Sequence, residues 1–340
     1  SSWRNIGGGR TAFSLPELAE IAAQNHHIFK ELQYLSNIDY KPIRYISFAH
    51  DEETYKALEA SKAWSKAEMI APKQFREEIS PYFNANPKKY ISALVSEDCW
   101  QATPGKVVDL VRNLGIAAGG TVMEDCRVLE ACREGKYTSV LVQTHDKKYV
   151  EYRTEHFVNA LGSGAGKLCD SMGIDAGLYP VRHQAFITRR LPMLGKHGTN
   201  LDMLIDRQDY KGFSAVYGQQ IAYTGQIIGC ASPKLDAMRI DKNLKVNTKA
   251  FLEIVSEMFS EWIPDLAGVG IQAVWAGYYT EPRYIVDPEL GLFVGMRGHG
   301  FMLSQYIARM YVDKLLGRPV PEYFEKLKLN GPGLSEKAFK

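Results

Sequence analysis

The sequence has 340 residues, which is enough for one large domain or for two intertwined domains. Hydrophobic residues account for 45% and charged residues for 24% of the chain, and the formal net charge of +2 comes with no basic tract that would favour a nucleic-acid partner. A run of about 18 apolar residues does not occur, so no membrane span is expected.

The cysteine and histidine patterns give no sign of a disulfide framework or of a metal site. The five cysteines are dispersed without a Cys-x-x-Cys pair: Cys99, Cys126, Cys132, Cys169 and Cys230. An odd, scattered set in a long chain predicts reduced thiols and a cytoplasmic location. The eight histidines follow no ligand spacing, so no metal, and in particular no zinc, is expected.

In the N-terminal half, helices alternate with strands. Ser14 is expected to cap a helix that has Pro16 in its first turn and ends near Leu35. Further helices are expected at 52–66, 75–81 and 105–114. Strands are expected at 43–49 and 90–95, and a run of strands bounded by turn signals is expected at 120–123, 126–132, 138–144 and 149–154.

A glycine-rich turn follows a predicted strand at 156–161. Gly162-Ser163-Gly164-Ala165-Gly166-Lys167 opens a helix that ends near Met172, an arrangement that looks like a nucleotide loop when taken alone. It lacks both the glycine spacing of a P-loop and the hydroxyl residue that follows the P-loop lysine, and it is not Gly-x-Gly-x-x-Gly. We interpret it as a strand-to-helix turn close to a ligand.

Downstream of Val181, strands are separated by hairpin-like connections. They are expected at 184–188, 202–206, 213–217, 226–231 and 268–274. A single clear helix, at 248–262, lies among them, which favours an antiparallel sheet. The Lys-rich tail after Pro321 is expected to be a surface extension. The pattern predicts two parts, an α/β part formed by 1–36, 98–178 and 275–330, and a mostly antiparallel part formed by 37–97 and 179–274.

A second glycine turn lies near the C-terminus. Strands are expected at 284–286 and 292–295, and a helix at 304–316 follows Gly298-His299-Gly300-Phe301-Met302. Glycines let a ligand approach the backbone, and the first N–H groups of a helix have no acceptor within it. The turn therefore predicts a site for an anion or a carbonyl, with a tight loop that binds nothing as the alternative.

Four segments resemble, in this order, the FAD-dependent amine and amino-acid oxidoreductases of the D-amino-acid oxidase, glycine oxidase and sarcosine oxidase superfamily. The likeness is closest to the flavin subunits of proline, sarcosine and opine dehydrogenases. The segments are Ser2-Trp3-Arg4-Asn5-Ile6-Gly7-Gly8-Gly9-Arg10, Thr103-Pro104-Gly105-Lys106-Val107-Val108, Val158-Asn159-Ala160-Leu161-Gly162 and Gly298-His299-Gly300-Phe301-Met302. The resemblance implies an α/β fold in which a Rossmann-like FAD-binding domain is interleaved with a mostly antiparallel substrate domain.

The resemblance also implies which residues surround the flavin and the substrate. Those expected around FAD are Ser2, Arg4, Gly8, Gly9, Val128, Ala160, Gly162, Gly298, His299, Gly300, Phe301 and Met302. Those expected on the substrate side are Arg10, Arg283, Tyr279, Met302 and His183. Arg10 and Arg283 are candidates for binding a substrate carboxylate, since the guanidinium is two-pronged, and Arg10 has a flavin-phosphate or surface role as its alternative. His183 is a candidate catalytic base, and the alternative is a hydrogen-bonded structural histidine.

Three departures from the superfamily modify these expectations. The initial β-α-β unit with Gly-x-Gly-x-x-Gly, roughly 40 residues, does not precede Ser1, so either the sequence is a clipped form or a second chain supplies the unit. The chain with this sequence is expected to bind FAD poorly alone. Residues 276–282 contain no cysteine, which implies non-covalent FAD. Met302 stands where sarcosine oxidases carry a lysine, and this implies an apolar amine pocket and an electron acceptor other than oxygen.

The resemblance thus predicts an FAD-dependent enzyme that oxidises an amino acid or secondary amine to an imine by hydride transfer to flavin N5. The implied substrates are proline-like, sarcosine-like or D-amino-acid-like small molecules, and an oligomer is expected. The alternative is a non-catalytic or partner-dependent flavoprotein subunit. An NAD-dependent dehydrogenase is a weaker third interpretation, since the glycine-rich turns stand in the wrong context.

Overall fold

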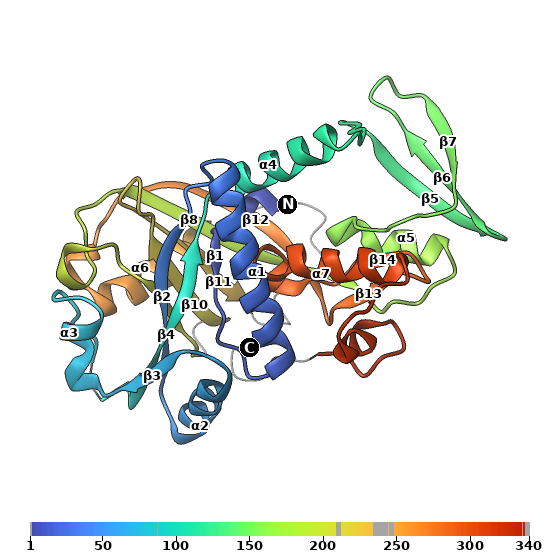
Figure 1. Cartoon of the computed structure of the whole chain (residues 1–340). Coiled ribbons are helices and arrows are strands. Elements are labelled where there is room, and N and C mark those ends of the chain that lie inside the picture. Colours follow the sequence, from blue (N-terminus) through green and yellow to red (C-terminus); the bar gives the residue numbers. More distant parts are fainter. Residues whose placement is uncertain are drawn as a thin grey trace.

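The computed structural model describes residues 2–86, 88–208, 212–233, 244, 248–334 and 336. Its largest element is a mixed sheet of nine strands (Figure 1) in the order β1-β4-β2-β9-β10-β11-β8-β12, with β3 paired to β4. Among these described strands, β2 and β9 pair in parallel and the other neighbours are antiparallel. The bounds are β1 Gly8–Gly9, β2 Lys41–Ala49, β3 Ala67–Ile70, β4 Ser92–Gln101, β8 Tyr179–Arg190, β9 Met203–Asp206, β10 Phe213–Gln220, β11 Gln226–Pro233 and β12 Ile271–Glu281.

The main hydrophobic core lies between this sheet and α6 (Thr248–Trp262). Apolar residues recur along α6 at helical spacing, so that one side of the helix is buried. The ring of Phe259 packs edge-on against Phe186 of β8, and the fully buried ring of Trp262 lies 6.0 Å from Phe48 of β2. The packing against α6 therefore holds β2 and β8 in place.

A second core forms where α1 (Pro16–Leu35) and α7 (Gly300–Leu315) pack against each other and against β4. Asn25 of α1 accepts a hydrogen bond from the backbone N–H of Tyr306 at 2.9 Å, which joins the two helices. Trp100 of β4 is fully buried in this core. The start of α7 is thereby held beside the sheet.

A separate lobe is built on a three-stranded antiparallel sheet, and α4 reaches toward it from the main body (Figure 1). The elements of this region are α4 Pro104–Ala117, β5 Arg127–Glu134, β6 Tyr137–Gln143, β7 Tyr149–Thr154, α5 Ala165–Ser171, β13 Ile285–Asp287 and β14 Leu292–Val294. The remaining α-helices are α2 Glu52–Ala60 and α3 Phe75–Glu78, and short 3-10 helices occur at Ser2–Arg4, Ser61–Trp64, Pro72–Gln74, Gly162–Gly164, Lys196–Gly198, Pro264–Leu266, Arg297–His299 and Glu322–Leu327.

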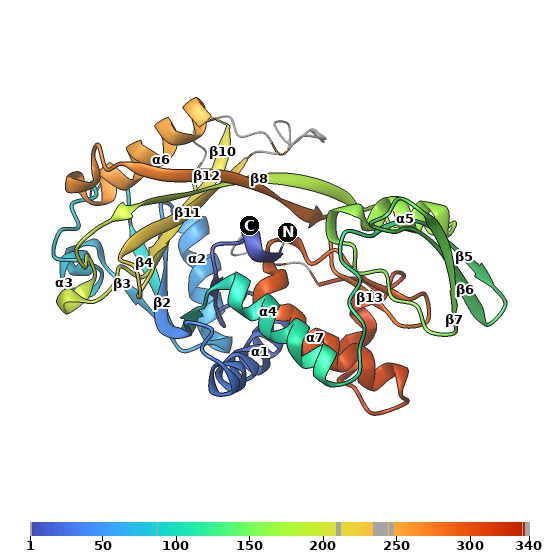
Figure 2. The ribbon, with the colours of Figure 1, turned by 90° about the horizontal axis from the view of Figure 1, so that it is seen from above.

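Strands β8 and β12 form a long antiparallel ribbon that connects the α6 side of the molecule with this lobe (Figure 2). Their pairing runs continuously from Ala273 opposite Ile187 to Glu281 opposite Tyr179. The ribbon crosses the predicted boundary at 274–275, and the division into two domains stays a prediction.

The predicted mixed α/β class with a mostly antiparallel part is confirmed by this architecture. Three local predictions are wrong. Residues 120–123 form no strand, residues 156–161 contribute a single parallel bridge from Asn159 to Leu292, and Ser14 is not the cap of α1. Leu15 occupies the N-cap position, and the N–H of Ser14 donates instead to Glu336.

None of the helices in the described ranges combines the length and the apolar character that crossing a membrane requires. The tail after Pro321 does not simply project from the surface, because Phe324 and Leu327 are fully buried against the second core.

Candidate active site

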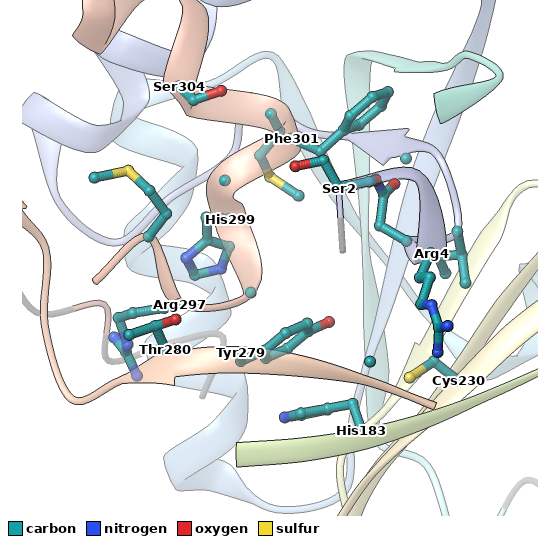
Figure 3. A pocket seen from close by; sticks show the side chains of 18 of the residues that line it. Ser2, Arg4, His183, Cys230, Tyr279, Thr280, Arg297, His299, Phe301 and Ser304 are labelled. Carbon is teal, nitrogen blue, oxygen red and sulfur yellow. The ribbon is translucent and has the colours of Figure 1, made fainter. Parts of the chain in front are cut away.

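A cavity of about 560 Å³ lies where the main sheet, the start of α7 and the N-terminal segment meet (Figure 3). Its wall takes residues from β8 to β12, from α4 and from the turn at 293–302. The described residues that line it include no Asp or Glu. Nor do three His, Cys, Asp or Glu side chains converge to hold a metal ion anywhere in the described ranges.

The second glycine turn brings the start of α7 to the cavity. The helix begins at Gly300, and the N–H groups of its first turn have no acceptor inside the helix. Gly298 lets the turn approach β12 closely, because a Cβ there would lie 2.6 Å from Cε2 of Tyr279. Arg297 adopts a left-handed backbone conformation with φ of 50°, and its Nε lies 2.6 Å from the carboxylate of Glu281. The turn therefore presents the positive end of a helix to the cavity.

The N-terminal segment is fastened to β12 beside the cavity. A guanidinium N–H of Arg4 donates to the carbonyl of Ala276 at 2.8 Å, and the indole N–H of Trp275 donates to the carbonyl of Arg4, also at 2.8 Å. Ser2 and Arg4 consequently form one border of the cavity, as Figure 3 shows.

An uncharged aromatic wall forms the part of the cavity that lies on the β8–β12 ribbon. The rings of His183 and Tyr279 (Figure 3) stack with their centroids 3.7 Å apart. The hydroxyls of Tyr279 and Tyr217 are 3.0 Å apart. Burial lowers the pKa of His183 to about 3, so its imidazole is neutral at neutral pH and accepts a proton poorly. Burial also raises the pKa of both tyrosines. The lowered pKa of His183 disfavours it as the catalytic base.

Besides Arg4 and Arg297, two further arginines line the cavity, Arg10 and Arg207. Arg10 is only 3% exposed, lies over the ring of Phe13 at 3.9 Å, and places Nη2 3.4 Å from Nε2 of His299. The other ring nitrogen of His299 lies 2.5 Å from the hydroxyl of Tyr284, so the histidine connects Arg10 to the glycine turn. Arg207 directly follows β9 and also lines the cavity. Burial lowers the pKa of Arg207 to about 9, which leaves it charged at neutral pH.

The cavity gathers most of the residues predicted from the sequence. Those that line it are Ser2, Arg4, Gly8, Arg10, Ala160, Gly162, His183, Tyr279, Gly298, His299, Gly300, Phe301 and Met302. The prediction missed Arg207, Arg297 and Cys230. Arg207 had one available signal, since a charged residue that directly follows the buried strand 203–206 is well placed to face a site at the end of that strand.

Three predicted residues do not line the cavity. Gly9 packs against Trp100 in the pairing of β1 with β4. Val128 lies on β5 against the core of the separate lobe. Arg283 donates to two backbone carbonyls of the C-terminal segment, so it anchors that segment and does not face a substrate carboxylate.

Several solved structures share this fold. The chain superimposes on the L-proline dehydrogenase from P. horikoshii with a TM-score of 0.78 and 22% identity, over 97% of this chain and 87% of that one. The glycine oxidase from Geobacillus kaustophilus has a TM-score of 0.78 and 16% identity, over 97% of this chain and 88% of that one. The iminodiacetate oxidase (IdaA) from Chelativorans sp. BNC1 has a TM-score of 0.74 and 12% identity, over 98% of this chain and 90% of that one. At such identities the likeness establishes the shared fold.

The sequence itself matches a family as well. No curated protein matches it significantly. The family described as DAO, FAD dependent oxidoreductase, matches residues 1–314, which confirms the resemblance carried by the four segments. Since this match spans most of the chain, the protein belongs to the DAO family of FAD-dependent oxidoreductases.

Proposed function

We propose that this enzyme oxidises an amino acid or a secondary amino acid to the imine, with non-covalently bound FAD and an electron acceptor other than oxygen. The observation that carries the proposal is the composition of one cavity. The cavity brings together the start of α7, the side chains of Arg10 and Arg207, and an uncharged aromatic wall.

The residues around the turn fit a flavin. A reduced flavin carries negative charge on the pyrimidine part of its ring, and the first-turn amides of α7 offer hydrogen-bond donors to such a charge. Ser2, Arg4, Ala160 and Gly162 line the same cavity and would contact the part of the cofactor that lies within it. A Cβ at Gly162 would meet nothing within 4 Å, so the backbone there is open to a ligand. When bound, FAD supplies the two-electron oxidation of the substrate.

The two arginines fit a substrate carboxylate. Arg10 and Arg207 both line the cavity, and a guanidinium recognises a carboxylate through paired N–H donors. The amine of the substrate would face the aromatic wall. Nδ1 of His183 is buried and has no hydrogen-bond partner among the described residues, so it can bond the amine. A neutral wall favours the uncharged amine, the form from which oxidation proceeds.

The non-covalent state of FAD is supported by the cysteine positions. Residues 276–282 contain no cysteine, and Cys230 is the cysteine that lines the cavity in the described chain. Burial raises the pKa of its thiol to about 12, so the reactive thiolate is scarce. The choice of acceptor rests on Met302, a buried apolar residue at the position where sarcosine oxidases carry a lysine.

The proposal is tested by mixing the FAD-loaded full chain anaerobically with proline, sarcosine, glycine and D-amino acids. Loss of the oxidised flavin absorbance with at least one of them is expected, with slow reoxidation by air and fast reoxidation by an electron-accepting dye. The variant Arg207→Met should raise KM for the active substrate by about 10- to 100-fold, the cost of a lost charged hydrogen bond. No absorbance change with any member of the panel would contradict the proposal.

A further inference from the structure

The strand that leads to Arg207 alternates between the cavity and the core on the α6 side of the sheet. Met203, Ile205 and Arg207 line the cavity. Asp206 is fully buried and lies opposite the core residue Val216 of β10. Because successive side chains of a strand point to opposite faces, Asp206 lies behind the wall of the cavity, directly before an arginine that lines it.

Three hydrogen bonds hold the carboxylate of Asp206. Its Oδ1 lies 2.6 Å from Nε2 of His50. Its Oδ2 accepts from the hydroxyl of Tyr90 at 2.7 Å and from the side-chain amide of Gln208 at 3.0 Å. Since Asp206 and Gln208 flank Arg207 in the sequence, this carboxylate ties the chain down on both sides of the arginine. The direction in which Arg207 leaves the backbone therefore depends on Asp206.

His50, which directly follows β2, lies between two hydrogen-bond acceptors. Its Nε2 faces the carboxylate of Asp206, and its Nδ1 lies 2.9 Å from the backbone carbonyl of Lys89. Neither of these oxygens has a proton to donate, and an imidazole donates from both ring nitrogens only when it is protonated. Loss of that proton therefore breaks one of the two hydrogen bonds and removes the charge that faces Asp206.

The surroundings of His50 favour its protonated form. Burial opposes protonation, but the hydrogen bond to Asp206 and its charge outweigh burial and raise the pKa of His50. The positive charge of Lys89 acts against this, and that amine is itself paired with Glu261 of α6 at 2.6 Å. The titratable and charged side chains around His50 include Asp51, Lys89, Tyr90, Asp206 and Glu261.

We propose that Asp206 is a positioning residue that holds Arg207 in the carboxylate subsite, and that His50 makes this hold depend on pH. Carboxylate binding is strong while His50 is protonated and weakens when His50 loses its proton. The inference rests on the proposed function, because it takes Arg207 as a residue that binds the substrate carboxylate. Neither Asp206 nor His50 lines the cavity, so both act through the backbone at the end of β9.

The test uses cyclopentanecarboxylate, which has the ring size of proline without the nitrogen and so cannot form an imine. Its dissociation constant from the FAD-loaded full chain is measured by calorimetry between about pH 6 and about pH 8, where the probe stays ionised. In the wild type the constant should rise by about tenfold across this range, the cost of weakening one charged hydrogen bond. A constant value, or no binding of the probe at all, would overturn the proposal.

Replacement of the histidine identifies the group that titrates. His50→Gln should remove the rise, because glutamine does not titrate. A rise that persists in this variant would come from Arg207, whose pKa burial lowers to about 9, and would refute the role of His50.

Two aspartates at the ends of β9 separate positioning from stability. Asp206→Asn keeps the side-chain shape but removes the charge, and at about pH 6 it should bind the probe about tenfold more weakly than the wild type. With an amino acid that reduces the flavin, it should raise KM and leave kcat unchanged, a split that a merely structural role would not produce. Asp202→Asn removes the buried carboxylate that pairs with Arg44 directly before β9. It should lower stability and leave the dissociation constant unchanged.

A milder variant covers the case in which Asp206→Asn does not fold. Tyr90→Phe removes a single donor to the same carboxylate and should raise the dissociation constant by about threefold. Wild-type binding in a folded variant of either residue would contradict the inference. If the constants respond as expected but no amino acid reduces the flavin, the proposed function fails and the positioning role stands. If an amino acid reduces the flavin but the constants do not respond, the proposed function stands and the positioning role fails.

Discussion

Replacement of Gly298 by alanine tests whether the closeness of the glycine turn to β12 positions the aromatic wall. A Cβ at this position would lie 2.6 Å from Cε2 of Tyr279, whereas carbon atoms in contact normally lie about 3.5 Å or more apart. The ring of Tyr279 is held by its stack on His183 and by the hydroxyl of Tyr217. Either the ring or the turn must therefore move by about 1 Å.

A shift of this size should damage catalysis more than folding. Misplacement by about 1 Å commonly lowers a rate about 100-fold, whereas forcing one extra carbon into a packed site costs about 1–3 kcal/mol of stability. We expect kcat/KM in a dye-coupled assay to fall by about 100-fold. The urea midpoint should fall only by the amount that corresponds to that modest loss of stability.

A second glycine provides the matched control. Gly115 lies in the exposed part of α4, and a Cβ there would meet nothing within 4 Å. Gly115→Ala should therefore raise the free energy of unfolding by about 0.5–1 kcal/mol and leave activity unchanged. Full activity in a folded Gly298→Ala variant would refute the reasoning, because it would show that the stacked rings tolerate displacement.

Three further outcomes are expected. Burial of His50 opposes its protonation, but the hydrogen bond to Asp206 at 2.6 Å and the charge of Asp206 outweigh burial and raise the pKa of His50. The pair therefore stabilises the fold fully below pH 6.5, the pKa of histidine in the unfolded chain. This stabilisation is lost as the pH rises through the higher pKa of the folded state. Urea unfolding across this range should show the decline, and His50→Gln should abolish it. In the wild type the carboxylate of Asp202 accepts a hydrogen bond from Nη2 of Arg44 at 2.8 Å, and Arg44→Met removes this partner. The variant should lose about 3–5 kcal/mol of unfolding free energy in the same assay, and a loss below about 1 kcal/mol would contradict this. Finally, Cys230 should resist alkylation at pH 8 in the native enzyme and react after denaturation, as read by mass spectrometry, and rapid native labelling would show that its thiol is not buried and protonated.

Much of the fold follows from local pattern. The helices Pro16–Leu35 and Thr248–Trp262 coincide with their predicted ranges because each carries an apolar stripe of helical period that ends at turn or cap residues. The strand Met203–Asp206 is equally plain, as an apolar run between polar turns. Such elements are encoded by residues close to each other in the chain.

The elements that differ depend on distant partners. Strands β8 and β12 extend well beyond the predicted 184–188 and 268–274, because each supplies backbone hydrogen bonds for the other outside the predicted ranges. Residues 120–123 have strand-like composition but pair with none of the described strands. Helix α7 begins at Gly300 and not at Ser304, since the packing of its first turn is tertiary.

The candidate site shows the same division. The glycine turn and the N-terminal segment were identifiable because their residue types and order resemble a family. The resemblance did not separate Arg283 from Arg207, and the one local signal of Arg207 is its position directly after the buried strand 203–206. The structure directs Arg283 to backbone carbonyls and brings Arg207 to the cavity.

The ribbon of β8 and β12 has a consequence for how the pocket can change. His183 and Tyr279 lie on these two strands, and their stack exists only in the observed register, because a slip of one strand by one residue would put the two rings on opposite faces of the sheet. That register is locked near its other end, where Phe186 of β8 packs against Phe259 of α6. The shape of the aromatic wall therefore depends on the α6 core, which lies away from the cavity. Variants that broaden substrate range should be sought in side chains such as Cys230 and Met302, with the α6 core left intact as the foundation of the site.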